Sequence, residues 1–77
     1  MLVKSTHFVN VLRDAKDNHH KVIFHLDIGN KVTWYVGIID VPNRQVMVGS
    51  AWLEFHNILK IVVCNPQNTT VERKKRI

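Results

Sequence analysis

Cross-links are scarce in this sequence of 77 residues. Cys64 is the only cysteine, so no disulfide forms within the chain, and such usage is typical of a reducing compartment such as the cytoplasm. The five histidines lack the spacing of a zinc site and no phosphate-binding glycine loop is present, so we expect no metal and no cofactor. Because so small a domain buries only about 60% of its unfolded surface, self-association is the stabilising device left by elimination.

Long apolar runs are also absent. No stretch approaches the roughly 20 residues that span a bilayer, and residues 1–7 contain no apolar targeting segment. The sequence therefore predicts a cytoplasmic protein with no membrane partner.

Acidic residues are few, because six Asp and Glu stand against eleven Lys and Arg, a formal net charge of +5. The excess is concentrated in residues 72–77, which hold four basic side chains and one acidic side chain. Such a segment attracts polyanions through the release of their counterions. The competing interpretation is a solvated end that keeps a small protein soluble.

Catalytic groups form no recognisable constellation. Cys64 and His56 could act as a nucleophile and a base, but Cys64 ends an apolar strand, where we expect a buried and inert thiol. Asp27, Asp40 and Glu54 form no acid–base pair with a known pattern. We therefore expect a binding protein and not an enzyme.

Period-two apolar spacing is the strongest pattern that the sequence does contain, between residues 22 and 63. Turn residues at 29–30, 42–43 and 49–50, and a short break at 56–57, separate five predicted strands, at residues 21–28, 31–40, 45–48, 51–55 and 58–63. A helix is predicted over residues 5–18, because Phe8, Val11, Leu12 and Ala15 form one apolar stripe. The chain leaves this helix at residues 18–20, where Asn18 is the residue that tolerates a left-handed conformation.

The second strand is long enough to require a bend, since ten residues at about 3.3 Å each span about 30 Å. Gly37, in its middle, is the position where a bulge is cheapest. The short break at His56 and Asn57 is typical of the turn that closes small barrels. The predicted fold is therefore mainly β, an N-terminal α-helix followed by a small five-stranded antiparallel barrel of the SH3-like type in residues 1–65. Residues 66–77 are predicted to be a basic, disordered tail.

Three aromatic residues lie on strands whose faces can be assigned from the alternation. Trp34 follows the apolar positions and is predicted to lie in the core, which places Tyr35 on the opposite face. Trp52 alternates away from Leu53 and Phe55, which predicts a wet or interfacial position. An exposed aromatic ring serves base stacking or anchors a subunit interface, and we favour the interface.

Three segments resemble the Sm-like fold, and within it the family of the bacterial RNA chaperone Hfq. The helix segment FVNVLR at residues 8–13 is similar to the family's Phe-Leu-Asn-x-Leu-Arg, and LDIGNKV at residues 26–32 to its Leu-x-Asn-Gly-x-x-Leu turn. FHNIL at residues 55–59 falls where the family has Tyr-Lys-His-Ala-Ile. The resemblance covers about residues 6–63 and implies a Sm-like barrel that forms a cyclic oligomer and binds single-stranded RNA.

A second resemblance is to the YolD-like family of small Gram-positive and phage proteins. It covers only the C-terminal half of the chain, in segments at residues 37–40, 45–48 and 53–61. It implies the alternative function, a protein-interaction or regulatory module of phage or plasmid type that acts on a host protein.

The leading hypothesis is RNA binding by three parts of the chain, with RNA and further copies of the chain as partners. The base pocket near the barrel-closing turn would be lined by Phe55, His56 and Asn57. A rim on the helix would consist of Asn10, Arg13 and Lys16. The tail would attract phosphates without regard to sequence through Arg73, Lys74, Lys75 and Arg76.

Overall fold

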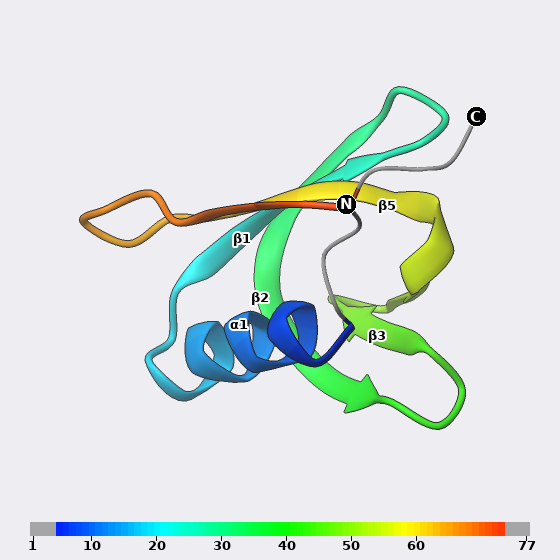
Figure 1. The fold of residues 1–77 in the computed structure, drawn as a ribbon, viewed down its shortest axis with the longest axis horizontal. Coiled ribbons are helices and arrows are strands. Elements are labelled where there is room, and N and C mark those ends of the chain that lie inside the picture. The colour runs from blue at the N-terminus through cyan, green and yellow to red at the C-terminus, as the bar shows by residue number, and fades with distance from the viewer. Residues whose placement is uncertain (1–4, 74–77) are drawn as a thin grey trace.

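The protein is one antiparallel sheet with a single helix packed against it (Figure 1). The computed structural model describes residues 5–73 of the chain. The elements run α1 (Ser5–Asp17), β1 (Lys21–Leu26), β2 (Lys31–Asp40), β3 (Gln45–Val48), β4 (Ala51–Glu54), the 3-10 turn η1 (Phe55–Asn57), β5 (Ile58–Val63) and β6 (Thr70–Glu72). The six strands of this part of the chain lie in the order β4-β3-β2-β1-β5-β6. The prediction of a mainly β fold with an N-terminal helix is confirmed.

The helix buries the apolar stripe that its spacing predicts. Phe8, Leu12 and Ala15 are fully or almost fully buried, and Val11 packs beside them. In Figure 1, α1 crosses the sheet over the curved β2 strand. Burial of one helical stripe against the sheet supplies most of the stability of a helix this short.

The end of α1 differs in one residue from the prediction. His19, and not Asn18, takes the left-handed conformation, with φ of 56°. The His20 N–H donates to the Ala15 carbonyl at 2.9 Å and the His19 N–H to the Lys16 carbonyl at 3.2 Å, which is the Schellman pattern. Asn18 instead donates its side-chain amide to the Asp14 carbonyl at 2.9 Å.

Strand β2 bends at the predicted position. Its register with β3 shifts between Val36 and Ile39, so the bulge includes Gly37. A Cβ atom at Gly37 would lie 3.0 Å from the Met47 carbonyl oxygen, which explains why a glycine occupies this close approach. The bend lets β2 pair with β1 through its first half and with β3 through its second half.

The sheet has one strand more than the sequence predicts and is open instead of closed into a five-stranded barrel. Strand β6 pairs with β5, with Val71 opposite Ile61, and Val71 is 3% exposed. Residues 70–72 are therefore ordered, where the prediction was a disordered tail. A three-residue strand with one apolar position is too short a pattern to stand out in the sequence. Residues 74–77 of the predicted tail lie outside the described residues.

The core lies between α1 and the concave face of the sheet. It joins the helix stripe to alternate strand residues such as Val22, Phe24, Val46 and Ile61. Trp34 is an exception to the predicted core, because its side chain is 50% exposed. It lies opposite Val22 in the register, but it extends past the core toward the turn at Gly49.

Candidate nucleic-acid interface

The convex face of the sheet collects basic side chains from three neighbouring strands. Side chains on directly opposite residues share a face, and successive residues alternate between faces. The register pairs His25 with Lys31 of β2 and with Lys60 of β5, and it pairs Lys21 with Tyr35. Val22 and Phe24, between them, face the core. The lysines and the histidine therefore point away from α1.

We call this surface the basic face and define it by its residues. These are Lys21, Ile23, His25, Lys31, Thr33, Lys60 and Val62.

Positive charge on the basic face is poorly compensated. Within residues 5–73, Lys31 and Lys60 form no ion pair, although Glu72 lies opposite Lys60 in the register. Burial, followed by the charges of Lys60 and Lys31, lowers the pKa of His25 from its ordinary value. An anion placed on this face would oppose that shift and favour the protonated imidazole.

Two aromatic rings lie at the end of the sheet where β1 begins, Tyr35 opposite Lys21 on the basic face and Trp34 opposite Val22 on the other face. Trp34 is 50% exposed and Tyr35 is 41% exposed. Their ring centroids lie 5.4 Å apart with the planes at 75°, an edge-to-face contact. The Lys21 ammonium nitrogen lies 5.8 Å from the Trp34 ring centroid and 5.7 Å from that of Tyr35. These three residues form what we call the aromatic corner, which offers partly exposed rings beside a cation.

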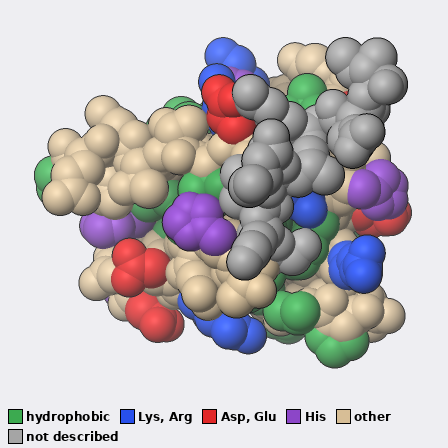
Figure 2. Space-filling view, in the orientation of Figure 1, with side chains coloured by type: hydrophobic (Ala, Val, Ile, Leu, Met, Phe, Trp, Pro, Cys, Tyr) green, Lys and Arg blue, Asp and Glu red, His purple; other side chains and the backbone are tan. Residues whose placement is uncertain are grey.

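The predicted rim on the helix lies on the other side of the sheet. Asn10, Arg13 and Lys16 are exposed on α1, whose buried stripe packs against the concave face. Asp14 and Asp17 are exposed on the same helix. In Figure 2 acidic and basic side chains are interspersed over the face that it shows, without a single basic patch. The structure does not bring the rim together with the basic face.

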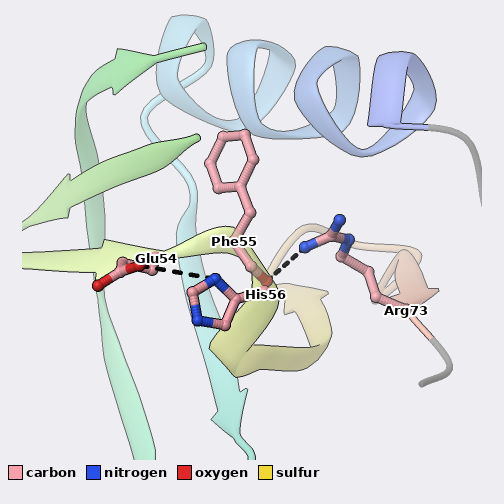
Figure 3. A network of polar contacts seen from close by, with 4 residues as sticks. All are labelled: Glu54, Phe55, His56 and Arg73. Atoms are coloured by element: carbon pink, nitrogen blue, oxygen red, sulfur yellow. Dashed lines mark hydrogen bonds and ion pairs between the residues drawn. The ribbon is translucent and has the colours of Figure 1, made fainter. Parts of the chain in front are cut away.

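The predicted base pocket is divided between the core and the surface (Figure 3). Phe55 is 3% exposed and its ring packs edge-to-face on Phe8, with centroids 5.1 Å apart. It therefore offers no ring face for a base, because the 3-10 turn directs it into the core. His56 is exposed and lies 3.5 Å from Glu54. Asn57 is partly buried, and its carbonyl accepts a hydrogen bond from the Asp27 N–H at 2.9 Å.

Arg73 connects β6 to the core instead of extending into solvent. Its guanidinium lies 4.5 Å from the Phe8 ring centroid and 5.8 Å from that of Phe55. The same guanidinium donates a hydrogen bond to the Phe55 carbonyl, as Figure 3 shows. Burial, and then the charge of Arg44, lowers the pKa of Arg73. Of the tail cations that the sequence predicts to bind phosphate, Lys74, Lys75 and Arg76 lie outside the described residues.

The basic face was missed by sequence reasoning, because it depends on the register between strands. A tight turn at residues 29–30 was predicted, and Gly29 has φ of 94° there, with the Leu26 N–H bonded to the Asn30 carbonyl at 2.8 Å. Pairing the strands around a two-residue turn would place His25 beside Trp34, whereas the structure has a longer connection, residues 27–30, and places His25 beside Lys31 and Lys21 beside Tyr35. The polar positions of β1 and β2, which the sequence marks only as exposed to solvent, thus become part of the basic face through this register.

Other kinds of site find little support in this structure. Among residues 5–73, no group of three or more His, Cys, Asp or Glu side chains is arranged to hold a metal ion. No helix in the same part of the chain is long and apolar enough to cross a membrane. Cys64 is exposed and not buried as predicted, because it follows the last residue of β5, where only its N–H bonds back to Lys21.

Comparison with known proteins identifies no relative of this chain. No protein-family model matches the sequence, and searches of curated proteins and of solved structures find no match either. The order of an N-terminal helix followed by an antiparallel sheet is compatible with the Sm-like fold.

Proposed function

We propose that this protein binds single-stranded nucleic acid, RNA in particular, through the basic face and the aromatic corner, without catalysing a reaction. The observation that supports the proposal is the meeting of Lys31, His25 and Lys60 across three strands with no ion pair at either lysine. Cations spaced across neighbouring strands fit the spaced phosphates of an extended nucleic-acid strand.

The two parts of the site contribute differently. Each lysine that contacts a phosphate releases counterions, so it adds affinity that does not depend on the base sequence and that decreases as the salt concentration rises. The exposed rings of Trp34 and Tyr35 offer stacking, which is worth about 1–3 kcal/mol per base. Bases in a duplex are already stacked on one another, so this corner favours a single strand over a double helix.

The preference for RNA rests on the proposed kinship with Sm-like proteins of the Hfq type. The long bent β2, the bulge at Gly37 and the single turn between β4 and β5 support that kinship. The interface proposed here lies on the convex face of the sheet, whereas the sequence predicted it at the 55–57 turn and on the helix. Phe55 in the core and the carboxylates beside Arg13 on α1 are the reasons for that move.

A charge-reversal experiment tests the location as well as the function. Fluorescence anisotropy of a labelled single-stranded RNA is measured against salt for Lys31→Glu/Lys60→Glu and for the matched pair Arg13→Glu/Lys16→Glu. We expect the sheet pair to lose at least tenfold in affinity near 0.1 M salt, and the slope of log K against log salt to become shallower by about 1.4, at about 0.7 for each phosphate contact. The helix pair should bind almost as the parent protein does.

Two other outcomes would contradict this expectation. Loss in the helix pair alone would move the interface back to the rim predicted from the sequence. Failure of the parent protein to bind single-stranded RNA or DNA would reject the proposal, and it would favour the module that acts on a host protein.

Tryptophan fluorescence provides an independent test of the aromatic corner. The chain has two tryptophans, so Trp34→Phe and Trp52→Phe are matched variants. We expect RNA to quench the emission of Trp52→Phe, whose remaining indole is Trp34, and to leave that of Trp34→Phe almost unchanged. Quenching that survives only in Trp34→Phe would place the bases elsewhere.

A further inference from the structure

An acidic and apolar groove runs beside the β4 strand, away from the basic face. It lies between β4 and residues 26–28 of the β1–β2 turn. Two of its apolar side chains are exposed, Ile28 at 75% and Trp52 at 43%. Glu54 supplies an exposed carboxylate to its lining, 3.5 Å from the His56 ring nitrogen Nδ1. In a chain of net charge +5, this combination favours a partner segment that is both basic and extended.

Strand β4 is a free edge of the sheet, because its only strand partner in the described chain is β3. The Phe55 N–H donates to the Arg44 carbonyl at 2.9 Å, which fixes the bonded positions of this antiparallel pair. Bonded and non-bonded pairs alternate, so Trp52 and Glu54 direct their backbone N–H and C=O groups outward. Natural edge strands are usually blunted by lysine, proline or a bulge, and residues 51–54 contain none of these.

We infer that this edge and groove accept the C-terminal segment of a second copy of the chain, residues 74–77, as an added antiparallel or parallel strand. The segment reads Lys-Lys-Arg-Ile, so three cations and one apolar side chain would meet Glu54 and the exposed apolar groups. The extended strand β6, residues 70–72, precedes this segment in the chain.

The contact joins two different surfaces, so it is heterologous. Each copy offers one groove and one C-terminal segment, and copies therefore associate head to tail into a closed ring or an open chain. A small domain gains stability from such pairing. The inference is independent of RNA binding, because the groove and the basic face use different residues.

The experiment compares absolute masses by size-exclusion chromatography with light scattering, after nuclease treatment and at about 0.1 M salt. One variant ends at Arg73 and so lacks the proposed inserting segment. The other is Glu54→Pro, which removes only an outward N–H, and the backbone at Glu54 suits proline with φ of −82° and ψ of 138°. Glu54→Lys is the second groove variant, which keeps the backbone donor and reverses the charge. Glu72→Gln, on β6, is the control for loss of a carboxylate.

We expect the parent protein and Glu72→Gln to be oligomers, with masses at least twice the 9.0 kDa of one chain. The truncated chain and both Glu54 variants should be monomers. An equimolar mixture of the truncated chain and Glu54→Pro should form a dimer, because one intact groove and one intact segment remain. A monomeric parent protein, or variants that assemble as the parent does, would overturn the inference. RNA affinity measured on Glu54→Pro, which keeps residues 74–77 and the basic face, reports separately on the proposed function.

Discussion

Arg73 provides the sharpest choice between a structural role and a role in RNA binding. The sequence places it in a phosphate-binding tail, whereas its guanidinium lies 4.5 Å from the Phe8 ring centroid and bonds to the Phe55 carbonyl. A partly buried cation–π contact contributes about 1 kcal/mol, and a hydrogen bond from a charged donor about 1.5 kcal/mol or more. Arg73→Ala should therefore lower the free energy of unfolding by about 2 kcal/mol.

The loss is large for a domain of this size. Total stability at about 0.05–0.15 kcal/mol per residue amounts to about 4–12 kcal/mol, so the variant remains folded at room temperature. A change of about 2 kcal/mol lowers the melting temperature by about 8–16 °C in a domain of 60–100 residues. Circular dichroism during heating, and urea titration at 20 °C, measure the change directly.

Two control variants separate the causes. Arg73→Lys keeps the charge but loses the planar fork, so we expect an intermediate melting temperature. Arg44→Ala removes the neighbouring like charge that helps to lower the pKa of Arg73, and it should leave stability equal or slightly higher. An Arg73→Ala variant that melts with the parent protein, yet binds RNA several-fold more weakly, would refute the structural assignment.

Three further predictions concern the turn, the bulge and the titration of the sheet. His19→Gly should raise the free energy of unfolding by about 0.5–1 kcal/mol, because φ of 56° strains a side chain, while Asn18→Gly should lower it by a similar amount; urea titration of both decides. Gly37→Ala should lower the free energy of unfolding by about 1–3 kcal/mol, because its Cβ would lie 3.0 Å from the Met47 carbonyl oxygen. Chemical denaturation measures this, and an unchanged free energy would show that the bulge accepts a side chain without strain. The lowered pKa of His25 means that the unfolded chain binds this proton more readily, so stability is complete above about pH 6.5 and falls as the pH drops through the ordinary pKa to the folded one. His25→Gln should flatten that part of the stability curve, and an unchanged curve would assign the titration to another group.

The sequence by itself determined the elements whose signals are local. The 3.6-residue spacing of Phe8, Leu12 and Ala15 defined the helix, and period-two spacing gave the bounds of β2, β3 and β5. The bend was predicted at Gly37 and the closing turn at residues 56–57, because glycine and a short polar break act on their own neighbours. Each of these features depends on a few residues adjacent in the chain, and the chain pattern contains them fully.

Only the tertiary structure decided which residues from distant segments meet. Val71 is buried because β6 pairs with β5, and that pairing turned a predicted tail into a strand and left the sheet open. Trp34 has the alternation of a core residue but extends beyond the core, while Arg73 packs against two rings, one from α1 and one from η1. The basic face likewise depends on the register between strands, in which Lys60 lies beside His25 across β1 and β5. Burial and charge clustering depend on contacts between segments far apart in the sequence, and no local spacing encodes them.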